Sequence, residues 1–168
     1  VLAKEHSKVV VMATPMTLSQ TKFNSMLHVY EDEANIIKMP CPGLVEYIEG
    51  GMLEGPVLDE YLEKQFEPYE KSEIDAVVLG CTHYPVLEDA VRRFMGESVT
   101  LINPGVAVAQ AVKKYLEKAD SANEGQNIGT HRFFVTDKPG SFKKTASVLL
   151  GEEIDDRKVE QVDLNSLC

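Results

Sequence analysis

A thiol, a hydroxyl and an imidazole stand on three consecutive residues, Cys81, Thr82 and His83, directly after a short apolar run. Side chains of these types can transfer protons, attack a carbonyl carbon or bind a metal ion. Gly80 precedes the three residues and Pro85 follows them, so the chain is expected to turn here and then to enter a helix. The sequence therefore predicts a reactive site at this turn.

The elements on either side determine where these three side chains lie. The apolar run at 76–79 is rich in valine, which is typical of a strand buried on both faces. Beyond the turn, apolar residues at 87, 90, 91 and 94 recur at the spacing of one helical face. The reactive residues are thus expected between the carboxyl end of a strand and the amino end of a helix. Backbone N–H groups and the helix dipole favour a carboxylate ligand or an ionised thiol there.

Further strands are expected near 9–13, 35–39 and 99–102, and helical segments lie between them. The first helical segment has apolar residues at 23, 26, 27 and 30, and the second follows Pro56. Alternating strands and helices predict an α/β fold with a doubly wound parallel sheet of the flavodoxin-like type. Ligands of such sheets bind beyond the carboxyl ends of the strands. Residues 1–103 are expected to form this lobe.

The chain changes character after residue 103. A helix beginning at Pro104 is followed by a polar linker at about 119–130, and then by a strand near 132–136, a short helix and a strand near 158–164. Two strands and a helix seldom bury enough surface to be stable alone. We therefore expect 104–168 to belong to a second, incomplete α/β lobe whose remaining strands come from elsewhere.

Two other strand ends carry residues that can join the site. Thr14 and Thr17 lie just after the first strand, where they can cap a helix, the commoner role, or bind a ligand carboxylate. Cys41 ends the second strand, and Glu49 follows about two helical turns later, a position that is usually solvated. Parallel strands end at one sheet edge, so the turns at Thr14, Cys41 and Cys81 can line a single cleft.

The pair Cys81 and His83 allows several interpretations. A nucleophile needs a base and an acyl-type substrate site, a metal site needs two further ligands, and acid–base chemistry needs only a polarised thiol. The other histidines show no ligand spacing, so no metal is expected. In the plainest alternative, Cys81 is a buried residue that closes the strand and His83 caps the next helix.

The overall composition excludes several classes of protein. The chain has 168 residues with 17 Lys and Arg against 27 Asp and Glu, a net charge of −10, and no basic stripe for nucleic acid. It has neither an apolar run long enough to cross a membrane nor the layout of a secretory signal. Three cysteines form no disulfide framework. These observations predict a soluble cytoplasmic protein.

The motif from Gly80 to Pro85 resembles the second catalytic motif of glutamate racemases. Segments 13–19, 41–45 with the following Glu-Gly-Gly at 49–51, and 134–137 resemble other carboxyl-half segments of that family, in the same order. The resemblance covers nearly the whole chain and implies a cofactor-independent racemase of two pseudo-symmetric α/β lobes that supplies D-glutamate for peptidoglycan. Where the family often has Asp-Ser-Gly, this chain has Asn-Pro-Gly at 103–105.

The resemblance also implies roles for the residues singled out above. Cys81 would be one of two catalytic thiols, Thr82 and His83 would contact the substrate or assist, and Glu49 would tune His83. The threonines at 14 and 17 are then expected to bind substrate.

The family's amino-terminal lobe and its cysteine motif are not found in this sequence, so the chain alone is expected to be inactive. Cys41 is not expected to replace the missing thiol, because it lies at the same sheet edge as Cys81. The expected partners are glutamate and the missing lobe, with a homodimer left open. Two alternatives remain: another amino-acid racemase, such as one for aspartate, although those typically carry Glu where His83 stands, or a lobe that binds carboxylates without catalysis.

Overall fold

The chain forms two compact units, divided between Ser121 and Ala122. A computed structural model describes residues 7–123, 125 and 129–166. The division falls inside the polar stretch at 119–130. Each unit has a parallel sheet of its own.

A four-stranded parallel sheet forms the centre of the first unit. Its strands are β1 (Ser7–Ala13), β2 (Ala34–Pro40), β3 (Ala76–Leu79) and β4 (Thr100–Ile102), in the order β2-β1-β3-β4. The register pairs Val10 with Ile37 on one side and with Val77 on the other. This arrangement confirms the expected parallel α/β fold. The chain passes from β1 to β2 on one side and then crosses back to β3 and β4 on the other side, so the strand order reverses between β1 and β3.

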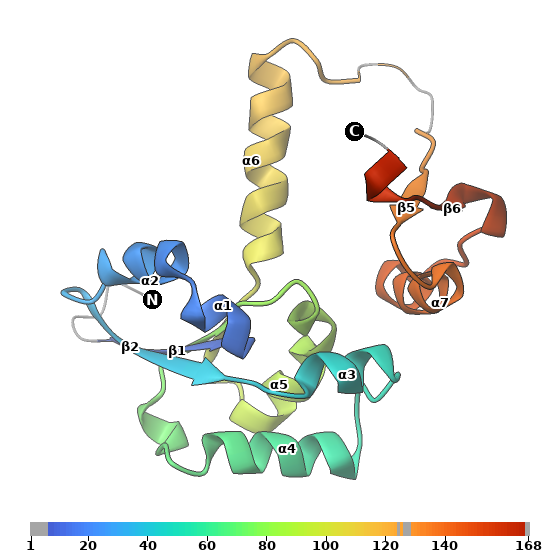
Figure 1. The fold of residues 1–168 in the computed structure, drawn as a ribbon. Coiled ribbons are helices and arrows are strands. Elements are labelled where there is room, and N and C mark those ends of the chain that lie inside the picture. The colour runs from blue at the N-terminus through green and yellow to red at the C-terminus, as the bar shows by residue number, and fades with distance from the viewer. Residues whose placement is uncertain (1–6, 124, 126–128, 167–168) are drawn as a thin grey trace. The chain divides into compact units, whose positions relative to one another are not determined.

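Helices cover both faces of this sheet (Figure 1). One face carries α2 (Thr21–His28), which follows the short α1 (Pro15–Ser19). The opposite face carries α3 (Leu44–Glu49), α4 (Pro56–Phe66) and α5 (Glu88–Met95). The short 3-10 helices of this unit are η1 (Lys71–Glu73) and η2 (Tyr84–Leu87).

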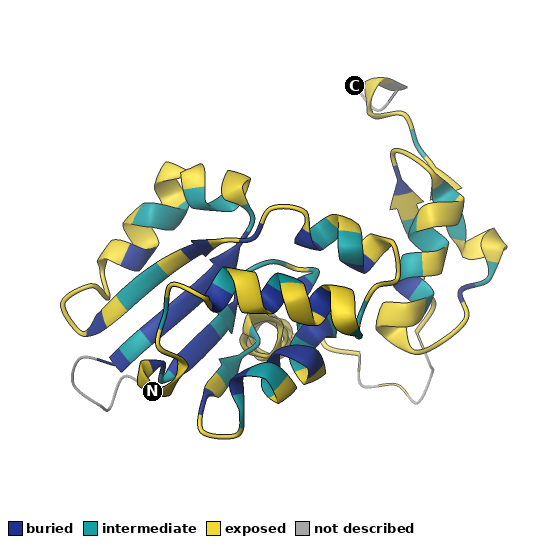
Figure 2. Ribbon diagram, turned by 90° about the horizontal axis from the view of Figure 1, so that it is seen from below, coloured by how far each residue is buried: buried dark blue, intermediate teal, exposed yellow. Residues whose placement is uncertain are grey.

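The strand residues alternate between two cores because successive side chains point to opposite faces of a sheet. Val10 and Met12 belong to the larger core, together with α4 residues such as Leu62. Val9 and Val11 belong to a smaller core with Leu27 of α2. In Figure 2 the dark blue of buried residues is concentrated in the strands of this sheet. Fully burying one side chain of this size stabilises the fold by about 1.5–3 kcal/mol. Because Cys41 and Tyr84, in the turns after β2 and β3, also belong to the larger core, their burial anchors these turns at the sheet edge.

Two helical segments differ from the sequence expectation. The first helix ends at His28, and Tyr30 lies in the turn beyond it. The turn after Cys81 enters the 3-10 helix η2 before α5 begins. Here Tyr84 N–H donates to the Cys81 carbonyl at 3.1 Å, three residues back, and Pro85 has no N–H to donate to a carbonyl four residues back.

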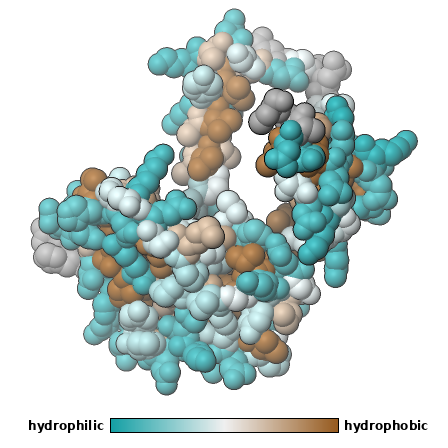
Figure 3. Space-filling view, in the orientation of Figure 1, coloured by the Kyte–Doolittle hydropathy of each residue, from teal (hydrophilic) through white to brown (hydrophobic). Residues whose placement is uncertain are grey.

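The helix α6 (Pro104–Lys118) extends the first unit beyond the sheet. Asn103 caps it, because the side-chain oxygen accepts a hydrogen bond from the Gly105 N–H at 2.9 Å. Asn103 therefore has a capping role at the position where the resembled family often has an acid. Apolar residues form a stripe along α6 (Figure 3), and Val108, Val112 and Tyr115 are all more than half exposed.

The second unit contains β5 (Phe133–Val135), α7 (Pro139–Leu150) and β6 (Val159–Gln161), with the 3-10 helices η3 (Asp156–Lys158) and η4 (Leu164–Ser166). β5 and β6 pair in parallel. β6 is shorter than the strand expected at 158–164, since the chain leaves the pair after residue 161 and enters η4. Among the described residues of either unit, no helix is both long enough and apolar enough to span a membrane.

Candidate active site

The predicted site residues gather at the carboxyl edge of the first sheet. The register pairs Ala13 with Pro40, and Met12 with Leu79, so the turns after β1, β2 and β3 lie next to one another. The turns after β1 and β3 flank the position at which the strand order reverses. In open α/β sheets this position is the usual place for a ligand.

Gly80 permits the close approach of the β3 end to β1. Its N–H donates to the Met12 carbonyl at 2.8 Å, and a Cβ added at Gly80 would lie only 2.7 Å from that oxygen. The φ of Gly80 is not positive, in contrast to that of Gly43. The glycine is therefore required by the lack of space for a side chain rather than by a left-handed backbone.

Three predicted residues form a chain of contacts at this edge. The Cys81 Sγ lies 3.9 Å from His83 Nδ1, and His83 Nε2 lies 3.5 Å from Glu49 Oε1. The His83 and Glu49 side chains are 31% and 54% exposed, so the pair is partly open to water. A carboxylate beside Nε2 favours the tautomer that carries its proton on Nε2, which leaves Nδ1 as the acceptor facing the thiol. This arrangement can exchange a proton between sulfur and imidazole.

The capping role considered for His83 does not describe its side chain. His83 stands at the N-cap position of η2, yet its ring makes no capping hydrogen bond to the described backbone. The ring contacts Cys81 and Glu49 instead. Cys81 itself is only partly buried, so it is not a sealed core residue.

The two threonines after β1 contact each other. Thr14 Oγ1 accepts a hydrogen bond from the Thr17 N–H at 3.2 Å and lies 2.9 Å from the Thr17 hydroxyl. Thr14 thus caps α1, the commoner of the two roles considered. Both residues are partly exposed at the sheet edge, while Thr82, beside the thiol, is exposed.

Cys41 differs sharply from Cys81 although both follow a strand. Its side chain is 1% exposed, and its Sγ lies 3.6 Å from the Met39 carbonyl oxygen. Burial raises the pKa of the Cys41 thiol to about 12. Cys41 therefore stays protonated near neutral pH and serves the core.

A cavity of about 480 Å³ opens beside Cys81 and Thr82. Apolar side chains line the rest of it, among them Phe23 and Leu27 of α2 and Val108 of α6. Cys81 therefore borders an open cavity, whereas Cys41 is enclosed in the core.

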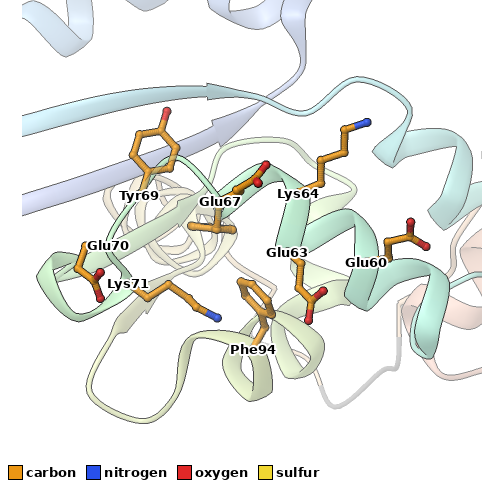
Figure 4. Close-up of a pocket in the computed structure, with 9 residues that line it drawn as sticks. Glu60, Glu63, Lys64, Glu67, Tyr69, Glu70, Lys71 and Phe94 are labelled. Carbon is orange, nitrogen blue, oxygen red and sulfur yellow. The ribbon is translucent and has the colours of Figure 1, made fainter.

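A second cavity, of about 570 Å³, lies between α4 and α5 and contains none of the predicted site residues (Figure 4). Lys71 lies 3.8 Å above the Phe94 ring there. Within the ranges that the structure describes, no group of three or more His, Cys, Asp and Glu side chains can hold a metal ion.

Two tyrosines next to the site were not singled out from the sequence. The Tyr61 hydroxyl donates to the Pro42 carbonyl at 3.0 Å, and the Tyr84 hydroxyl donates to the Cys41 carbonyl at 3.4 Å. Burial raises the pKa of both phenols. The position of Tyr84 next to His83 was a usable signal, whereas Tyr61 had only its place on the apolar face of α4.

Comparison with known proteins places these features in context. The glutamate racemase of Clostridium novyi is 40% identical over 145 residues, which cover 86% of this chain and 56% of that protein. The glutamate racemase of Clostridium acetobutylicum is 43% identical over 126 residues, covering 75% of this chain and 49% of that protein. This chain thus spans about half the length of the curated relatives that it matches. No protein-family model matches it.

Solved structures agree with the sequence comparison. A glutamate racemase from Francisella tularensis, in complex with D-glutamate, matches with a TM-score of 0.81 at 26% identity, over 95% of this chain and 59% of that one. A glutamate racemase isoform from Bacillus anthracis matches with a TM-score of 0.79 at 29% identity, over 94% of this chain and 57% of that one.

Proposed function

The chain is related to the glutamate racemases in sequence and fold, over roughly half of their length, and we propose that it supplies one acid–base thiol of a racemase. The contact chain from Cys81 through His83 to Glu49, at the reversal point of the sheet, carries this proposal. The substrate is glutamate, because the relatives are named for it and one related structure holds D-glutamate.

Inverting an α-carbon without a cofactor requires two acid–base groups. One thiolate removes the α-proton from one face of the amino acid, and a thiol on the opposite face returns a proton to the resulting carbanion. In this proposal Cys81 is one of these groups, and His83 holds or returns the proton of its sulfur. Glu49 keeps the imidazole oriented and stabilises it when it is charged.

The substrate carboxylate has candidate donors at the same edge. The exposed Thr82 hydroxyl adjoins the thiol, and the hydroxyls of Thr14 and Thr17 lie at the end of the neighbouring strand β1. Hydroxyl and backbone N–H donors near the start of a helix suit a carboxylate. We assign substrate binding to these three threonines and to His83.

The opposing thiol is assigned to a counterpart lobe outside this sequence. Cys41 is unsuitable, because it is buried, has a raised pKa and belongs to the same sheet edge as Cys81. Residues 104–168 would return to that lobe. Because the opposing thiol belongs to the counterpart lobe, the chain by itself does not racemise glutamate. The complete enzyme would need no cofactor and would supply D-glutamate for peptidoglycan, and hence for cell shape, in the cytoplasm.

Racemisation of L-glutamate, followed by the optical activity of the solution, tests this proposal. In the protein that includes the counterpart lobe, Cys81→Ser should abolish turnover, while Cys41→Ala, the matched control, should retain it. Turnover that survives Cys81→Ser would refute the assignment. Turnover by the isolated 168-residue chain would refute the need for a second lobe.

The same assay separates the alternatives. Faster turnover of aspartate than of glutamate would assign a different amino acid to the site. Saturable glutamate binding without turnover, in the protein that includes both lobes, would identify a carboxylate-binding lobe instead.

A further inference from the structure

The contact between Glu49 and His83 depends on how the short helix α3 is oriented. α3 runs from Leu44 to Glu49, so Glu49 is its last residue. The helix is about 9 Å long, so a tilt of about 10° at its start moves its end by about 1.5 Å. Site geometry tolerates displacements of only about 0.5 Å. The turn at 41–43, from which α3 begins, must therefore be held firmly.

Tyr84 links this turn to the turn that carries the reactive thiol. Its backbone N–H donates to the Cys81 carbonyl at 3.1 Å, and its hydroxyl donates to the Cys41 carbonyl at 3.4 Å. Its side chain is fully buried in the larger core. A single residue thus links the ends of β2 and β3, which are not neighbours in the sheet, through its backbone on one side and its side chain on the other.

Tyr61 holds the next carbonyl of the same turn. Its hydroxyl reaches the Pro42 oxygen from α4 at 3.0 Å. Its ring packs edge-on against the Tyr47 ring of α3, with ring centroids 5.5 Å apart. Two consecutive carbonyls, Cys41 and Pro42, are therefore bound by hydroxyls from two different elements.

We propose that Tyr84 and Tyr61 are positioning residues, which hold the turn at 41–43 so that Glu49 stays in contact with His83. They act through Glu49 and do not touch the substrate. This proposal rests on the proposed function for its catalytic meaning. The geometric part concerns only the imidazole and can be measured in the chain without turnover.

The protonation pattern of the His83 ring provides that measurement. A carboxylate at Nε2 keeps the proton on Nε2 and leaves Nδ1 as the acceptor facing Cys81. Nitrogen-15 NMR distinguishes this tautomer from a mixture, since the resonances of a protonated and an unprotonated ring nitrogen lie far apart. Spectra would be recorded at about pH 8.5, where an ordinary imidazole is neutral. The His83 signals would be assigned by their loss in His83→Asn.

Glu49→Gln gives the full change in the separation of the two His83 nitrogen resonances against which the other variants are compared. Without the carboxylate the ring becomes a mixture of tautomers, so the two resonances should lie closer together. Tyr84→Phe should shift them in the same direction, and Tyr61→Phe should do so less strongly. Water can replace the exposed Tyr61 bond, but it cannot easily reach the buried Cys41 carbonyl. Tyr47→Phe is the matched control, because the described residues show no hydrogen bond to its hydroxyl, and it should leave the resonances unchanged.

The proposal is overturned if both Tyr84→Phe and Tyr61→Phe keep the wild-type His83 resonances, even when the variants are less stable. A shift in all three tyrosine variants would also overturn it, since that would indicate general loosening. Tyr61→Phe keeps the test open if Tyr84→Phe does not fold. Because no turnover is measured, a racemase assay that fails for Cys81 would leave this result interpretable.

Discussion

Replacing Gly80 by alanine tests whether close strand approach positions the reactive turn. The new Cβ would lie 2.7 Å from the Met12 carbonyl oxygen, a backbone atom of the central strand β1. A backbone atom cannot rotate away, so the end of β3 must move outward and weaken the 2.8 Å bond from the Gly80 N–H to that oxygen. Overpacking of this kind costs about 1–3 kcal/mol, and losing one hydrogen bond costs about 1 kcal/mol more.

The free energy of unfolding should therefore fall by about 2–4 kcal/mol, measured by urea denaturation with far-ultraviolet circular dichroism. Gly140→Ala is the control, because an added Cβ there meets nothing within 4 Å and the residue lies in α7. Alanine in a helix should leave stability unchanged or raise it by up to about 1 kcal/mol. If Gly80→Ala lowers the free energy of unfolding no more than Gly140→Ala does, the close approach of β3 to β1 does not require a glycine at this position.

Two further predictions concern the buried and the open thiol. In a Cys168→Ser background, chosen because residue 168 lies outside the described residues, iodoacetamide should modify Cys81 in the folded chain. Cys41 should react roughly a thousandfold more slowly than in the unfolded chain, because a pKa of about 12 instead of 9.0 leaves that much less thiolate; equal labelling of the two cysteines by peptide mass spectrometry would contradict this. Raising the pH from about 9 to about 12 should lower the free energy of unfolding, since the folded Cys41 thiol keeps its proton while the unfolded thiol loses it. Tyr61 and Tyr84, whose pKa values are also raised, add to this loss. Cys41→Ala should make the free energy of unfolding, measured by urea denaturation, fall less steeply with pH. An unchanged dependence on pH would show that Cys41 does not contribute.

Much of the first unit follows from local patterns in the chain. The valine-rich run before Cys81 and the alternation of strands with helices predict a parallel sheet, and a parallel sheet brings Thr14, Cys41 and Cys81 to one edge. Proline at the start of α4 and α6 marks where those helices begin. These features depend on neighbours within a few residues, so they can be derived without knowing the packing.

The contacts that give the candidate site its chemistry join residues that are distant in sequence. The sequence pattern places Glu49 on a helix and His83 after a strand. It does not specify the tilt of α3, which brings Glu49 Oε1 to 3.5 Å from His83 Nε2. Nor does it distinguish Cys41 from Cys81, since both follow apolar strands, yet one thiol is buried and the other borders a cavity. Local spacing specifies which face of an element is apolar, whereas the distance between two elements arises from many weak packing contacts distributed over the whole core.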